Sequence, residues 1–381
     1  MKKLLLFITL LISGLGLNAQ SVGDYFFQTH NGNIFQCKIT SINPAECTLV
    51  HIVERSGKDL VIPSKLMAEE FQKEFNVTSI QDGSFSSGWE NVTFEKPSYM
   101  KYIGKRAFRN ADYLKSIEIP NSVITIGEEA FEFSSLESVT FENNSKLKTI
   151  EKNAFNGTDL KNITFPKSVE TIAHMAFYCC NLSSVTFEDD SQLTTIGQLA
   201  FAALSDFVGY KSSLLSVSFG NNSQLTTIET SAFSGCEKLS TVSLGTNSKL
   251  TAIGKGAFNN CSSLLSIEIP NTVEIIDDSA FEGCSSLSSI KFGDVSQLTN
   301  IENEAFKNCS SLTSIEIPSN VEIIGVNAFE GCSFLSSIKF GDVSQLTNIE
   351  NEAFKNCSSL TSIEIPSKVE IIDVNAFEGC I

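Results

Sequence analysis

The eleven cysteines are the most obvious candidates for chemistry in this chain of 381 residues. Eight of them share one spacing, three residues after the phenylalanine of an Ala-Phe pair: Cys180, Cys236, Cys261, Cys284, Cys309, Cys332, Cys357 and Cys380. One thiol per repeat predicts a column of buried, packed cysteines. Disulfides are the alternative in an exported chain, but parallel side chains in a column have poor geometry for bridges.

The other three cysteines stand outside this column. Cys179 precedes Cys180 directly and is expected to point outward. Cys37 and Cys47 lie in a β-rich N-terminal region, where a disulfide across a hairpin and two separate thiols are both open. A metal site is disfavoured, because the chain has no Cys-x-x-Cys motif and no histidine in the column.

Catalytic groups do not converge anywhere in the sequence. The three histidines, His30, His51 and His174, are scattered, and no Ser/His/Asp or Cys/His pattern recurs. Acidic residues after the predicted strands (Asp189-Asp190, Asp294 and Asp342) are interpreted as turn caps, with calcium binding as the weaker alternative. We therefore predict no enzyme and no cofactor. A net charge of -17 without a basic patch disfavours nucleic acid as a partner.

A repeat positions these residues. Ala-Phe pairs recur every 22 to 25 residues, with one step of 32, and their phenylalanines are Phe108, Phe131, Phe155, Phe177, Phe201, Phe233, Phe258, Phe281, Phe306, Phe329, Phe354 and Phe377. Phe85 is a degenerate first member. A fixed period of this length is the signature of a solenoid. Residues 288–332 and 336–380 are almost the same sequence, which indicates a recent duplication.

Each repeat contains Leu-x-x-Ile-x-Ile/Phe, from Leu114/Ile117/Ile119 to Leu360/Ile363/Ile365, and this alternation predicts a short strand. The Ala-Phe segment is expected to form a single helical or 3₁₀ turn on the opposite wall. The predicted fold is an α/β solenoid. Its coils of 23–25 residues would form a right-handed superhelix, with a parallel β-sheet on the concave face and an N-terminal β cap.

Three segments are predicted. Residues 1–19 have the basic start, apolar run and small-residue exit of a signal peptide, and no other run is long and apolar enough to span a membrane. Residues 20–80 form a β cap, with hairpin turns at 31–33 and 56–58. Residues 81–381 form about 12–13 coils. The last coil has no capping unit, which suggests self-association or a missing continuation.

The outward strand positions form a candidate ligand face: Glu118, Thr140, Thr164, Thr186, Ser218, Ser243, Glu268, Lys291, Glu316, Lys339 and Glu364. Two residues earlier in each strand runs a second column, almost wholly Ser and Thr. A polar face that serves only solubility is an equally good interpretation. The long step between Phe201 and Phe233 adds a candidate binding loop with Asp206, Phe207 and Tyr210, for which a tolerated insertion is the alternative.

The frame Cys-x-x-Leu-x-x-Ile-x-Ile-Pro-x-x-Val-x-x-Ile-x-x-x-Ala-Phe resembles the BspA-like class of leucine-rich repeats, over residues 77–381. Some coils depart from it, with Phe-x-x-x-Ser-x-Leu in place of Ile-Pro-x-x-Val, as in 292–298 and 340–346. The resemblance implies a secreted or cell-surface protein that binds host or microbial proteins, often in adhesion. Two other functions stay open: an assembly module that interacts end to end, and a glycan-binding accessory protein.

Overall fold

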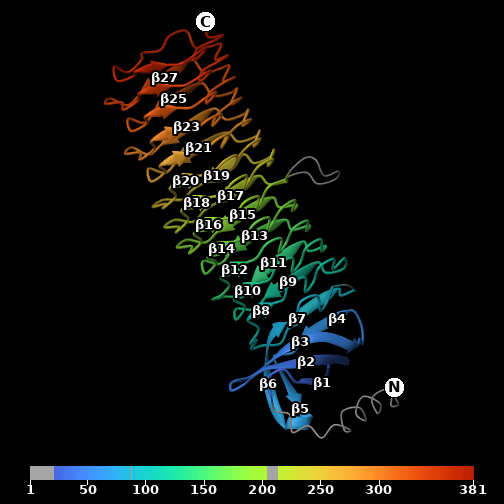
Figure 1. Cartoon of the computed structure of the whole chain (residues 1–381). Helices are drawn as coiled ribbons and strands as arrows, with labels where there is room; N and C mark the ends of the chain where they lie inside the picture. The colour runs from blue at the N-terminus through green and yellow to red at the C-terminus, as the bar shows by residue number, and fades with distance from the viewer. Residues whose placement is uncertain (1–20, 87, 204–212) are drawn as a thin grey trace.

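The computed structural model describes residues 21–86, 88–203 and 213–381. Coils stack into one long body, with the N-terminal strands at one end and the C-terminus at the other (Figure 1). The predicted signal peptide and the loop residues Asp206, Phe207 and Tyr210 lie outside the described residues.

The N-terminal cap is made of strands β1 to β6. Their bounds are β1 (Tyr25–His30), β2 (Asn33–Ile42), β3 (Ala45–Glu54), β4 (Asp59–Ile62), β5 (Lys65–Ala68) and β6 (Lys73–Ile80), with the 3₁₀ helix η1 (Glu69–Phe71) before β6. Strands β1, β2 and β3 pair antiparallel. The predicted hairpin turn at 31–33 is confirmed, since Asn31 and Gly32 both have positive φ and connect β1 to β2.

The second predicted hairpin, at 56–58, is wrong. Strand β4 does not return along β3 but pairs in parallel with β7 (Asn91–Phe94) of the first coil. Likewise β6 pairs in parallel with both β3 and β8 (Tyr102–Ile103). The cap strands thus continue the two ladders of the solenoid and cover the edges that its first coil would otherwise expose.

The first ladder of the solenoid follows the predicted strands. After β7 come β9 (Ser116–Ile119), β11 (Ser138–Phe141), β13 (Asn162–Phe165), β15 (Ser184–Phe187), β17 (Ser216–Ser218), β19 (Thr241–Ser243), β21 (Ser266–Ile269), β23 (Ser289–Phe292), β25 (Ser314–Ile317) and β27 (Ser337–Phe340). Hydrogen-bonded pairing joins β9 to β11, β13 to β23 in turn, and β25 to β27, and it is parallel and in register, as for β21 with β23. The predicted strand at Leu360/Ile363/Ile365 is wrong, since residues 361–366 form no strand.

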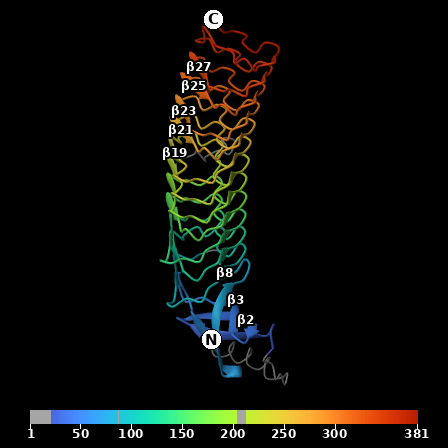
Figure 2. The same cartoon turned by 90° about the vertical axis from the view of Figure 1, so that its left-hand side faces the viewer.

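A second ladder was not predicted. It consists of two-residue strands that end in the isoleucine before each Ala-Phe turn: β8, β10 (Thr125–Ile126), β12 (Thr149–Ile150), β14 (Thr171–Ile172), β16 (Thr195–Ile196), β18 (Thr227–Ile228), β20 (Ala252–Ile253), β22 (Ile275–Ile276), β24 (Asn300–Ile301), β26 (Ile323–Ile324), β28 (Asn348–Ile349) and β29 (Ile371–Ile372). These strands pair in parallel from coil to coil. Figure 2 shows β19 to β27 along one edge of the stack.

The Ala-Phe segments form consecutive turns and not the helical turn that we expected. The residue before the alanine has a positive φ in every coil, from Arg106 (57°) to Asn375 (57°). In this conformation the N–H of one phenylalanine donates to the alanine carbonyl of the next coil, as from Phe258 to Ala280 (2.8 Å). A helical turn would direct these groups along its own axis, so stacking between coils excludes it. In the described residues η1 is the single helix, and the α component of the predicted fold is absent.

The phenylalanines of these turns form the spine of the core. From Phe108 to Phe377, rings of neighbouring coils stack with centroids 5.0–5.3 Å apart. The inner strand residues and the alanines join them in one continuous hydrophobic cluster that runs from the cap to the last coil. The predicted solenoid of about twelve stacked coils is confirmed. One coil buries too little apolar surface to fold alone, so each depends on its neighbours.

Candidate functional site

The cysteine column is buried in the core, as its spacing predicts. Each thiol donates to the phenylalanine carbonyl of the preceding coil, as Cys284 Sγ does to Phe258 O (3.3 Å). Burial raises the pKa of the Cys180, Cys284 and Cys357 thiols to about 12. Because the thiolate is the nucleophile and the metal ligand, these side chains have a packing role and not a chemical one.

Two expectations outside the column change. Cys179 is buried and not outward, because it packs with Tyr178 and Ala202, and Met175 and Leu199 pack against this small cluster. Cys37 and Cys47 are both buried and both free thiols in the cap. They are offset across the β2–β3 ladder, where Cys37 lies opposite Leu49. Burial and a hydrogen bond to Cys47 raise the pKa of Cys37.

In the part of the chain that the structure describes, no group of three or more His, Cys, Asp or Glu residues is placed to hold a metal. Asp189 caps a turn, as predicted, since its Oδ1 accepts from the N–H of Asn221 in the next coil (2.7 Å). Asn221 in turn accepts from the N–H of Thr246 (3.0 Å). The polar turn residues are therefore engaged with one another.

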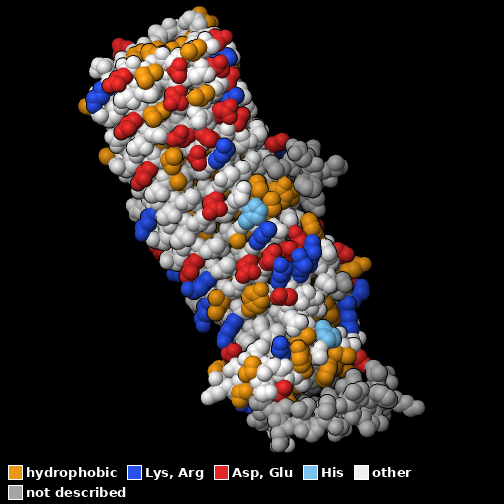
Figure 3. All heavy atoms as spheres, viewed as in Figure 1, with side chains coloured by type: hydrophobic (Ala, Val, Ile, Leu, Met, Phe, Trp, Pro, Cys, Tyr) orange, Lys and Arg blue, Asp and Glu red, His pale blue; other side chains and the backbone are white. Residues whose placement is uncertain are grey.

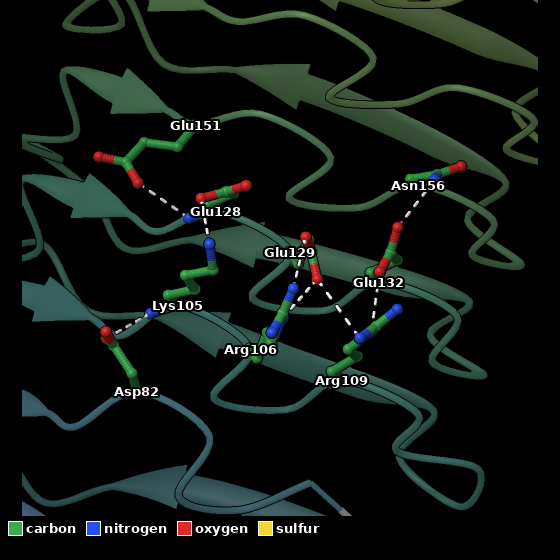
Figure 4. Close-up of polar contacts among 9 residues, drawn as sticks. All are labelled: Asp82, Lys105, Arg106, Arg109, Glu128, Glu129, Glu132, Glu151 and Asn156. Carbon is green, nitrogen blue, oxygen red and sulfur yellow. Dashed lines mark hydrogen bonds and ion pairs between the residues drawn. The ribbon is translucent and has the colours of Figure 1, made fainter.

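A charged network links neighbouring coils beside the Ala-Phe turns (Figure 4). Arg106 donates to both carboxylate oxygens of Glu129 (2.5 and 3.1 Å), and Arg109 Nε lies 2.8 Å from Glu132 Oε2. The hydrogen bonds from Arg106 lower the pKa of Glu129, whereas burial raises that of Glu132. Asn156 donates to the second oxygen of Glu132 (3.0 Å).

This network ties adjacent coils together laterally. Its four charged side chains balance one another, and its contacts run from coil to coil with a spacing of 23 or 24 residues. The hydrogen bonds from Arg106 argue against Glu129 as a general base, because a carboxylate with a lowered pKa holds its proton weakly. No repeated pattern indicated this network, since Arg106, Glu129 and Glu132 occupy positions that vary from coil to coil.

The eleven outward residues from Glu118 to Glu364 and the Ser/Thr column beside them lie on the same side of the stacked strands, and we call this surface the strand face. Ten of the eleven are exposed, and Thr186 is half-buried. Paired strands place them in adjacent positions, as for Thr164 beside Thr186, Glu268 beside Lys291 and Glu316 beside Lys339. The structure thus brings together residues that are up to 246 positions apart in the sequence.

The charges on this face are weakly held. Lys291 Nζ lies 3.4 Å from Glu268 Oε1, and both side chains are about 70% exposed (72% and 70%). Near the cap, Lys96 contacts Glu118 (3.1 Å) and Glu142 (2.7 Å). Exposed ion pairs of this kind contribute little to stability, so a ligand can replace them at small cost.

Clefts lie on this face, and the turns that follow the strands form one side of each cleft. They were not predicted from the sequence. One cleft of about 660 Å³ lies between the turns at Val295 and Val343, with Lys291, Glu316 and Pro318 in its lining. Another, of about 850 Å³, lies over Lys339, Glu364 and Pro366. Val295 and Val343 are each 69% exposed. The sequence feature that could have indicated these clefts is the longer turn of the Phe-x-x-x-Ser-x-Leu coils. This turn projects past the shorter Ile-Pro turns.

Much of the molecular surface is uncharged. Figure 3 shows wide stretches of white side chains and backbone, acidic groups over the C-terminal coils, and a mixed patch of both signs lower on the same side. In the described ranges no helix is long and apolar enough to cross a bilayer.

Comparison with known proteins identifies the repeat. The model for the "BspA type Leucine rich repeat region (6 copies)" matches residues 78–208, 204–295 and 251–381. No curated protein matches the chain. A leucine-rich repeat protein from Bacteroides ovatus is 26% identical, with a TM-score of 0.58 over 96% of this chain and 93% of that one.

Two further solved structures align over most of the chain at lower similarity. A leucine-rich repeat protein from Eubacterium ventriosum is 19% identical, with a TM-score of 0.44 over 94% of this chain and 95% of that one. The pneumococcal vaccine antigen PcpA is 22% identical, with a TM-score of 0.42 over 92% and 93% of the two chains. The family model spans well over half of the sequence, and the chain therefore belongs to the BspA-type leucine-rich repeat family.

Proposed function

We propose that the chain is an exported, non-catalytic binding protein that presents its strand face to a protein ligand on a host or microbial surface. The family in general is non-enzymatic and binds proteins. Export is supported by the basic and apolar segment at the N-terminus.

One observation carries the proposal. Ten of the eleven outward residues are exposed, and the parallel pairs of strands place them in register, as in β13 to β23, whereas strands such as β9, β21 and β25 bury their alternate residues. A broad surface of this kind, built on a rigid stack, can contact a protein ligand without reordering. The opposite wall is taken up by the hydrogen-bonded turns and the charged network.

The test measures binding of the mature chain to immobilised matrix proteins, epithelial cells and microbial surfaces. Thr164→Arg and Ser218→Arg each place a large cation on the strand face, at exposed positions. Gln198→Arg is the matched control, because it adds the same charge at an exposed position beside the Ala-Phe turn. We expect each strand-face variant to weaken binding by about tenfold and the control to leave it unchanged. An absence of binding to the whole panel, or equal effects of all three variants, would refute the proposal.

A further inference from the structure

The C-terminal half of the strand face repeats its charges every two coils. Its outward column runs Glu268, Lys291, Glu316, Lys339 and Glu364, and all five are exposed. Neighbouring strands of a sheet lie about 4.8 Å apart, so like charges recur about every 9.6 Å along the stack. Stacking is uninterrupted over this stretch, since the rings from Phe258 to Phe354 keep centroid spacings of 5.2–5.3 Å.

The two clefts described above repeat with the same period. Each contains a lysine, a glutamate, a proline, a half-buried phenylalanine and an exposed valine, and the corresponding residues of the two clefts are 48 positions apart. The phenylalanines are Phe292 and Phe340, which pack against the core from its edge. A surface that presents the same set of groups twice, two coils apart, fits a ligand that has a repeat of the same length.

The repeat length selects the conformation of such a ligand. Polyproline II has three residues per turn and rises about 3.1 Å per residue, which gives a repeat of about 9.3 Å. From Glu268 to Glu364 the face spans about 19.2 Å, and six polyproline II residues span about 18.6 Å. Fourteen residues of α-helix span about 21 Å, which is longer than this stretch of the face, so the spacing of a helical ligand does not match it. A β-strand repeats about every 6.7 Å and does not match.

The chemistry of the face agrees with this choice. The backbone of polyproline II forms no internal hydrogen bonds, and its carbonyls can accept from the hydroxyls beside the charged column, such as Ser266, Ser289 and Ser314, of which each is exposed. An α-helix has no free carbonyls along its length to use them. Prolines of the ligand can pack on the valines and phenylalanines that line the clefts.

The charges of this face determine which charge its ligand should carry. Three glutamates and two lysines make up the column, and the whole chain carries a net charge of -17. We propose that the C-terminal half of the strand face binds a proline-rich segment in the polyproline II conformation, with a basic residue at every third position. This inference rests on the proposed function, because it names the ligand class of the same face.

The test compares two labelled peptides by fluorescence anisotropy at physiological salt. One is (Lys-Pro-Pro)₅; the other has the same five lysines and ten prolines, with the lysines in two adjacent pairs and one single position. We expect the periodic peptide to bind at least about fivefold more tightly, because several exposed ion pairs of modest strength form together only when the spacing matches. Equal affinities would overturn the inference, since simple charge attraction would then suffice.

A charge-conserving variant supplies the matched control. The exchange Lys291→Glu with Glu316→Lys keeps the net charge and the composition of the face but puts like charges on adjacent coils. We expect the variant to lose the preference for the periodic peptide while its thermal unfolding stays close to that of the natural chain. A retained preference would overturn the inference. If panel proteins bind through the strand face but neither peptide does, the inference fails and the proposed function stands.

Discussion

Replacing Phe258 by alanine removes one ring from the middle of the phenylalanine stack. The side chain is fully buried, and its ring stacks on Phe233 and on Phe281 with both centroids 5.3 Å away. Truncation of a buried phenylalanine costs about 3–5 kcal/mol, through lost burial and the cavity that it leaves. Since each coil is stabilised by its neighbours, the loss affects the interfaces on both sides of this coil.

Phe377 provides the comparison within the same stack. Its ring has one stacking partner, Phe354 at 5.3 Å, and its side chain is half-buried. We expect Phe377→Ala to cost about 1–2 kcal/mol, because less surface and one interface are lost. Urea unfolding followed by circular dichroism measures both variants. Equal losses, or a loss below about 1 kcal/mol for Phe258→Ala, would refute the view that stacked rings carry the stability of the solenoid.

Three further predictions concern single residues. Cys284, with a pKa of about 12, stays protonated at pH 8, so a thiol reagent should label it only after unfolding in guanidinium; rapid labelling of the folded chain, seen by mass spectrometry, would contradict its packing. Because hydrogen bonds from Arg106 lower the pKa of Glu129, the ionised carboxylate stabilises the fold above the unfolded pKa, and this contribution is lost as the pH falls through the lowered folded value. Glu129→Gln should therefore be less stable than the natural chain in urea at pH 7, and the difference should disappear once the pH lies below the folded pKa of Glu129; a difference that persists in strong acid would exclude this cause. Gly157 has φ +67°, and a Cβ there would lie 2.5 Å from Phe133 Cδ1. Gly157→Ala should therefore lower the free energy of unfolding by about 1–3 kcal/mol. Adding Phe133→Ala should restore only part of this loss, and full restoration would show that the backbone conformation costs nothing.

The core of this fold could be predicted from spacing alone. The phenylalanines, the column cysteines and the inner strand residues all recur with the coil, and most are buried where the period places them, whereas Phe377 and Cys380 of the last coil are half-buried. Inward and outward alternation in the strands then determines the strand face. These features depend on one physical requirement, that every coil presents the same apolar side chains to the next.

The turns could not be predicted in the same way. The left-handed residue before each alanine varies from coil to coil, as in Arg106, Met175 and Leu199, and is a glycine at Gly256 alone among the described coils, so no recurring glycine signals the conformation. Hydrogen bonds between coils impose it instead. The second ladder could not be predicted, because each of its strands has two residues, which is too short to show an alternation of inward and outward residues.

Corrections in the cap and at Cys179 have a related cause. Strand β4 pairs with β7, about thirty residues later, and not with its neighbour in sequence. Cys179 is covered by side chains of the adjacent coil, Leu199 and Ala202. Similarly, the clefts depend on how far the turn at Val295 projects past the shorter turn at Pro318, which is a property of two coils together.

Amide hydrogen exchange of the mature chain, with and without a captured protein ligand, tests the binding role of the strand face most directly. We predict slower exchange in the ligand complex within strands β9 to β27 of the strand face, with no change at the Ala-Phe turns. Slower exchange confined to those turns, or to the cap, would contradict it.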